Sequence, residues 1–235
     1  MAEPLGEGTT RPQDVRPQDV RVWDPLLRIA HWSFALLVPA MWWTAENSKW
    51  ALHRRIGLVL LGVLLFRVLW GFLGPETARF SQFVKGPRAV LAYLRGALPD
   101  AARAIGHSPL AGWSTLALIG AMLAQVSMGL FAGDPYDGMT GPLNPLVGVL
   151  LADTVTEWHE TFFWVVAGLA ALHLSAITFY AVRGQDLVSP MLSGDRPPLE
   201  GVAGIGPMPW GRGLLAVGLA AALALWVAYG APPLT

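Results

Sequence analysis

Long stretches without charged residues constrain the fold of this chain most strongly. Four stretches contain no Asp, Glu, Lys or Arg: residues 29–45, 108–133, 161–182 and 213–235. A fifth, residues 56–74, contains only Arg67. A helix needs about 20 apolar residues to cross the hydrocarbon core of a bilayer. We therefore predict an all-α fold, an integral membrane helical bundle with five transmembrane helices.

The composition agrees with a membrane protein and excludes several kinds of site. The chain is 54% hydrophobic and only 14% charged, whereas a soluble domain carries about 25% charged residues. It has no cysteine, which excludes disulfides, thiolate metal sites, iron–sulfur clusters and covalently attached c-type haem. Its formal net charge is zero, which argues against nucleic acid as a partner.

The sequence divides into four parts. Residues 1–20 are polar and contain a tandem Arg-Pro-Gln-Asp-Val repeat, so we predict a disordered cytoplasmic tail. Residues 21–183 hold four of the apolar segments and are expected to form a four-helix domain. Residues 184–212 are rich in Gly and Pro, which predicts an irregular linker. Residues 213–231 form the fifth predicted helix.

The basic residues predict the orientation in the membrane. An inner N-terminus leaves only Lys49, Arg54 and Arg55 on the outer side. It puts these basic residues on the inner side: Arg11, Arg16, Arg21, Arg28, Arg79, Lys85, Arg88, Arg95, Arg103, Arg183, Arg196 and Arg212. Lys and Arg are enriched in cytoplasmic segments of membrane proteins. We therefore expect the N-terminus inside and the C-terminus outside.

Two connecting segments differ in character. The inner segment 75–110 has apolar residues near helical spacing with basic residues among them. This pattern predicts either a helix lying in the membrane interface or an ordinary amphipathic connector. The outer segment 132–157 is acidic and has no basic residue. It fits a docking surface for a basic protein, or a loop that is simply solvated.

Four histidines lie in or at the ends of apolar segments: His31, His53, His159 and His173. Ionisable residues at membrane depth usually mark a functional site. His159 and His173 share one helix face and are about 21 Å apart along its axis, too far to bind a single metal ion. The predicted topology places His31 with His173 near the inner side, and His53 with His159 near the outer side.

Two histidine pairs at two depths are what two b-type haems require. Each iron takes one imidazole from either side of the porphyrin, and the porphyrin lies between facing helices. With both axial positions filled, such a haem carries electrons and does not readily bind dioxygen. Any one of these histidines alone could instead be an interfacial residue or a hydrogen bond between helices. His107 has no partner, and we expect a surface or loop role for it.

Three arginines are candidates for contacts with haem propionates. Arg67 is 14 residues after His53 and so lies about 21 Å deeper on the same helix face, at the inner level. A guanidinium can bind a carboxylate through two hydrogen bonds. Arg67 could instead extend to the inner interface. Arg54 and Arg55 are the corresponding candidates at the outer level, with the same alternative.

The motifs resemble those of a known family. They are Val22-Trp23-Asp24-Pro25-Leu26-Leu27-Arg28-Ile29-Ala30-His31-Trp32, His53-Arg54-Arg55-Ile56-Gly57, Phe66-Arg67-Val68-Leu69-Trp70-Gly71-Phe72, Gly86-Pro87-Arg88, and Glu157-Trp158-His159-Glu160 with His173. Together they resemble the bacterial cytochrome b561 and Ni,Fe-hydrogenase cytochrome b family over about residues 21–197. Two features depart from that pattern: Ser108 stands where relatives have Asn, and the fifth helix lies beyond the family's usual end.

The resemblance implies a function in electron transfer. It implies a four-helix protein of the bacterial inner membrane with two b-type haems, bound by His31, His53, His159 and His173. Such a protein passes electrons between quinone and a periplasmic c-type cytochrome, hydrogenase or other dehydrogenase subunit. It is then one subunit of an oxidoreductase complex, and we expect quinone to bind in the inner half. The alternatives are a self-contained oxidoreductase that acts on quinone with a small donor such as superoxide, and a non-redox transporter or scaffold.

Overall fold

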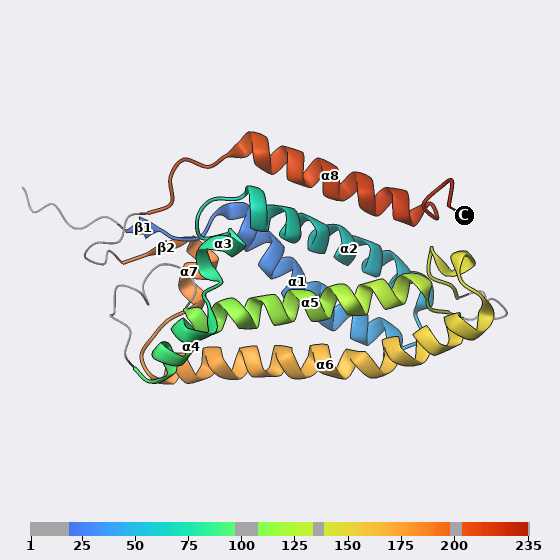
Figure 1. Cartoon of the computed structure of the whole chain (residues 1–235), viewed down its shortest axis with the longest axis horizontal. Helices are drawn as coiled ribbons and strands as arrows, with labels where there is room; N and C mark the ends of the chain where they lie inside the picture. The colour runs from blue at the N-terminus through green and yellow to red at the C-terminus, as the bar shows by residue number, and fades with distance from the viewer. Residues whose placement is uncertain (1–18, 97–107, 134–138, 198–203, 235) are drawn as a thin grey trace, which may run out of the picture.

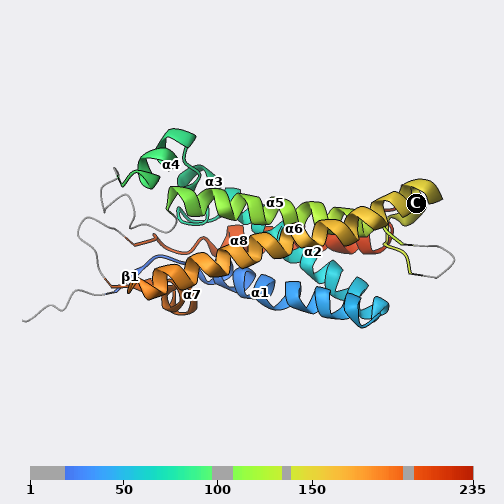
Figure 2. The same cartoon turned by 90° about the horizontal axis from the view of Figure 1, so that it is seen from below.

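Five long helices lie side by side along the long axis of the molecule (Figures 1 and 2). The computed structural model describes residues 19–96, 108–133, 139–197 and 204–234. The long helices are α1 (Pro25–Glu46), α2 (Trp50–Leu73), α5 (Pro109–Phe131), α6 (Val149–Val182) and α8 (Trp210–Ala228). The predicted all-α membrane bundle is confirmed. Strand β1 and the C-terminus lie at opposite ends of the long axis (Figure 1).

Four of these helices are long and apolar enough to cross a membrane: α2, α5, α6 and α8. Helix α1 has 22 residues and is about 33 Å long, but its mean hydropathy is lower than that of the other four. Its sequence includes His31, Trp32 and the Trp42–Trp43 pair, which lower its hydropathy. It nevertheless packs along α2 within the bundle, as a spanning helix would.

The helices pack in two groups. The first group consists of α1, α2 and α8, with α2 between the other two. The second group consists of α5 and α6. Small residues of α8 allow a close approach to α1 and α2: Ala216 and Ala220 are buried, and a Cβ on Gly213 would come within 2.6 Å of Leu26 Cδ1. Such contacts drive helix association in lipid, where the hydrophobic effect is weak. The fifth helix is therefore an integral part of this bundle.

The segment 184–212 differs from the predicted irregular linker. It contains helix α7 (Val188–Ser193) and strand β2 (Asp195–Arg196), and β2 pairs antiparallel with β1 (Val20–Arg21). Gly194 makes the turn between α7 and β2 possible, because its φ of 96° is one that other residues rarely adopt. The predicted disordered tail falls almost wholly on residues outside the described part of the chain.

Both connecting segments contain helical turns. In the inner one, α3 (Phe80–Phe83) and α4 (Pro87–Leu94) are separate helices, because Pro87 disfavours helical geometry in the residue before it. Tyr93 of α4 is hydrogen-bonded to Tyr180 of α6 with 2.7 Å between their hydroxyl oxygens. In the outer one, a 3-10 helix (Asn144–Leu146) is followed by α6, which begins at Val149 and so includes residues 149–157, predicted as part of the loop.

Candidate functional site

Helix α6 brings two histidines into contact with the first helix group. The ring centre of His173 is 6.3 Å from that of His31 in α1. The ring centre of His159 is 6.2 Å from that of His53 in α2. These are the pairs that the topology predicts. After the orientation that the basic residues predict, we call them the inner pair (His31 and His173) and the outer pair (His53 and His159).

The spacing within each pair fits a bis-histidine iron. First-row metal ions bind histidine nitrogen at about 2 Å, so two imidazoles on opposite sides of one ion have ring centres roughly 6 Å apart. In the described part of the chain, no three His, Asp or Glu residues come together as a metal site. A haem iron needs only two protein ligands, because the porphyrin supplies the other four. The donor set therefore fits b-type haem better than a protein-only metal site.

The outer pair is oriented by hydrogen bonds to the backbone. Nδ1 of His53 lies 3.0 Å from the carbonyl oxygen of Met41, and Nδ1 of His159 lies 2.9 Å from that of Gln125. A carbonyl oxygen only accepts, so each Nδ1 carries the proton and donates. This leaves Nε2 of each ring unprotonated and available to bind iron.

Two side chains complete the surroundings of the outer pair. The hydroxyl oxygen of Thr44 lies 3.1 Å from His53 Nδ1 and can accept from it, while the hydroxyl hydrogen is within reach of carbonyls of its own helix. Thr44 is fully buried. Gln125 donates from Nε2 to the carbonyl oxygen of His159 at 2.8 Å. This bond joins α5 to α6 at the level of the outer pair.

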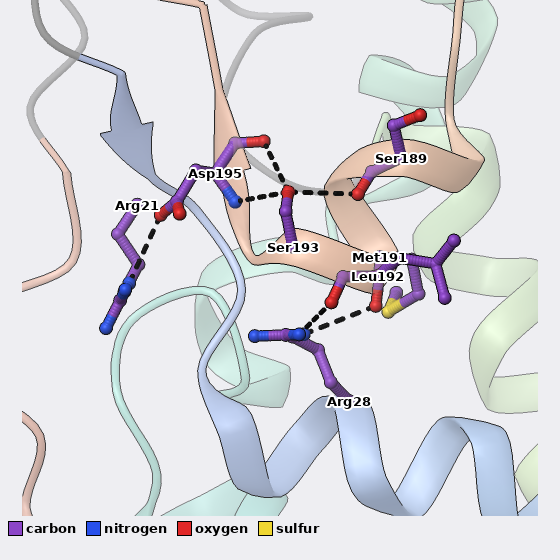
Figure 3. Close-up of polar contacts among 7 residues, drawn as sticks. All are labelled: Arg21, Arg28, Ser189, Met191, Leu192, Ser193 and Asp195. Carbon is purple, nitrogen blue, oxygen red and sulfur yellow. Dashed lines mark hydrogen bonds and ion pairs between the residues drawn. The ribbon is translucent and has the colours of Figure 1, made fainter.

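The described residues give the inner pair no comparable hydrogen bonds. His31 Nδ1 is buried and has no hydrogen-bond partner among the described residues. The turn of α1 that carries His31 is instead hydrogen-bonded to helix α7. Trp32 Nε1 donates to the Met191 carbonyl at 3.2 Å, and Arg28 donates to the carbonyls of Met191 and Leu192 (Figure 3). Helix α7 thereby holds the inner end of α1.

Arg67 is buried rather than extended to the interface. Its residue is 3% exposed, and its guanidinium carbon lies 5.0 Å from the Phe80 ring centre and 6.0 Å from that of Phe83. Its Nη1 atom has no hydrogen-bond partner in the described part of the chain. Such an unpaired donor is costly, so it is suited to bind an anionic group. Arg54 and Arg55 are exposed, and His107 lies outside the described residues.

A buried carboxylate joins the inner ends of α1 and α2. Asp24 is the N-cap of α1 and accepts a hydrogen bond from the Leu27 N–H at 2.9 Å. Trp70 Nε1 lies 3.1 Å from both carboxylate oxygens of Asp24 and donates to them. Burial raises the pKa of Asp24, and these hydrogen bonds oppose the rise. Asp24 also interacts electrostatically with Arg67.

Asp24, Thr44 and Gln125 were not predicted from the sequence to be functional. For two of them, the sequence does carry a signal. Gln125 is an amide inside an apolar helix, where polar residues usually have a partner. Asp24 followed by Pro25 is a typical helix start, with an N-cap side chain and proline in the first turn. The contact between Thr44 and His53 depends on the packing of two helices, and no local pattern indicates it.

The comparison with protein families agrees with this geometry. A sequence model described as prokaryotic cytochrome b561 matches residues 22–194. The match includes all four paired histidines and ends in the turn between α7 and β2, before α8. No curated protein and no solved structure matches the chain with significant similarity. The chain belongs to the prokaryotic cytochrome b561 family, a family of membrane electron-transfer proteins that carry b-type haem.

Proposed function

We propose that this protein holds two b-type haems, one at the inner pair and one at the outer pair, and conducts electrons across the membrane. The observation that carries the proposal is the presence of two histidine couples with ring centres 6.3 and 6.2 Å apart, on helices that span the bundle. When bound, each haem supplies a one-electron couple. His31 and His173 would hold one haem iron, and His53 and His159 the other.

An apolar layer separates the two pairs. On α6, Val166 lies midway between His159 and His173 and is 3% exposed. It belongs to a buried cluster that also includes Leu60 and Leu64 of α2. Such a layer excludes water between the two levels. It therefore supports two distinct redox sites, and the packed side chains between them would form the path for electron transfer.

The partners we propose are quinone and a periplasmic redox protein. We propose that the N-terminus lies in the cytoplasm and the C-terminus in the periplasm, in a bacterial inner membrane. The distribution of charge supports this orientation. Arg28 is hydrogen-bonded to α7 and Arg79 is the N-cap of α3, whereas Asp153 and Glu157 are in the first turns of α6. Helices α3 and α7 lie at one end of the long axis, and α6 begins at the other (Figure 1). Basic residues favour the cytoplasmic side.

A vesicle experiment tests the proposal. The purified protein is reconstituted in vesicles that enclose ferricyanide, and a membrane-impermeant reductant is added outside. We expect about two haems b per chain by pyridine haemochrome assay, and reduction of the enclosed ferricyanide. The His31→Ala and His53→Ala variants should each bind about one haem and reduce ferricyanide much more slowly. Two bound haems without transfer, or no haem at all, would contradict the proposal.

A further inference from the structure

The two histidine pairs differ in the groups that surround them. In the outer pair both Nδ1 atoms donate to backbone carbonyls, at 3.0 and 2.9 Å. In the inner pair His31 Nδ1 has no partner among the described residues. A hydrogen bond from Nδ1–H to a carbonyl makes the imidazole a more basic, more electron-donating ligand. Such a ligand stabilises ferric iron relative to ferrous iron and lowers the reduction potential.

The charged residues at the inner level also favour a higher reduction potential for the inner haem. Adding an electron to a haem lowers its charge by one, so a nearby cation favours reduction. Arg67 is buried at the inner level, and Arg79 also has a buried, unpartnered Nε atom among the described residues. Asp24 is the opposing charge at this level, but the two guanidinium groups of Arg67 and Arg79 outnumber it. The arginines of the outer level, Arg54 and Arg55, are exposed and therefore screened by water.

From these two differences we infer that the outer pair holds the haem of lower reduction potential and the inner pair the haem of higher potential. The inference rests on the proposed function. With both haems bound, an electron would pass from the outer haem, which is thereby oxidised, to the inner haem, which is thereby reduced, without transfer of a proton. The favourable direction is from a periplasmic donor toward the inner side. In this account Thr44 is a positioning residue for His53, and Arg67 sets the potential of the inner haem.

A redox titration of the haem-loaded protein tests the inference through reduction potentials rather than activity. Wild-type protein should show two one-electron waves. Thr44→Val removes one acceptor of the His53 Nδ1–H but keeps the side-chain shape and the Met41 carbonyl. It should shift only the lower wave, and upward. The shift should be less than tenfold in the ferric–ferrous equilibrium, which for one electron is less than about 59 mV.

A second variant tests the inner site independently. Arg67→Gln removes the buried charge and should shift only the upper wave, and downward, whereas Arg67→Lys should largely restore it. Thr115→Val is the matched control for Thr44→Val, because the Thr115 hydroxyl donates only within its own helix, to the Ala111 carbonyl at 2.9 Å. It should leave both waves in place.

The outcomes separate this inference from the proposed function. If Thr44→Val moves the upper wave, or moves neither wave, the assignment of the lower potential to the outer pair is wrong, while the two-haem protein stands. If Arg67→Gln moves the lower wave, the charge argument is wrong. If the wild-type protein does not show two haem waves, the proposed function fails, and this inference fails with it.

Discussion

Gly129 of α5 lies directly against the imidazole of His159 on α6. A Cβ atom on residue 129 would come within 2.8 Å of His159 Cε1 and 3.3 Å of Nδ1, which is closer than van der Waals contact allows. The glycine therefore makes room for the imidazole and for its bond to the Gln125 carbonyl. It also fixes how closely α5 and α6 approach at the outer level.

Substitution of Gly129 should therefore weaken haem binding at the outer pair. In Gly129→Ala the methyl group displaces the His159 ring, and we expect a loss of about tenfold or more in affinity for the outer haem, as for other residues that orient a metal ligand. Haem content and the low-spin absorption bands measure this loss. Gly120→Ala on the same helix is the control, since its added Cβ would meet no atom within 4 Å. Equal haem content in both variants would refute this role.

Asp24 should stabilise the inner end of the bundle through its two acceptor roles. In Asp24→Ala the α1 N-cap is lost, at about 1 kcal/mol. The buried Trp70 N–H also loses its acceptor, at about 1–3 kcal/mol. Asp24→Asn keeps an acceptor oxygen and should cost less. Thermal unfolding of the haem-loaded protein in detergent, followed by haem absorbance, measures both; an Asn variant as unstable as the Ala variant would contradict this account.

The stability difference between wild type and Asp24→Asn should depend on pH. Burial raises the pKa of Asp24, so the folded state holds this proton more tightly than the unfolded state does. Wild-type stability relative to the variant is therefore greatest below the ordinary carboxyl pKa. It falls as the pH rises through the raised value. The same unfolding measurement over a pH series checks the sign, and a difference that grows with pH would refute it.

The α7 turn should depend on glycine at position 194. Its φ of 96° disfavours any other residue, and a Cβ there would come within 2.9 Å of the Trp23 carbonyl oxygen and of Arg28 Nη1. Gly194→Ala should destabilise the protein by about 1–3 kcal/mol. Because Arg28 and Trp32 hold the turn that carries His31, the inner haem should be lost first on heating. Gly206→Ala, which meets open space, should behave like wild type.

Much of this architecture could be predicted from the sequence because lipid imposes simple rules. Long charge-free segments predict the helices, and alternating helix direction then predicts which histidines lie at the same depth. The grouping of His31 with His173 and of His53 with His159 needs no more than that. The length of α6 was underestimated, because its first turns carry Asp153 and Glu157 and extend beyond the apolar segment.

Other features depend on tertiary packing. The bond between Thr44 and His53 joins the end of α1 to the start of α2, and no sequence pattern fixes its geometry. The Gly- and Pro-rich segment after α6 was predicted to be irregular. The turn at Gly194 and the pairing of β2 with β1 became visible only when residues far apart in the sequence were placed together. The burial of Arg67 under Phe80 likewise depends on where α3 folds back.

The most direct test of the account is the loss of haem in four single variants, one for each paired histidine. Each variant should bind about one haem b per chain. By potentiometric titration with electron paramagnetic resonance, His31→Ala and His173→Ala should lose the same signal, and His53→Ala and His159→Ala the other. The control is His107→Ala, which should retain both haems. Losses that group His31 with His53, or a wild-type protein without bound haem, would contradict the pairing on which the account depends.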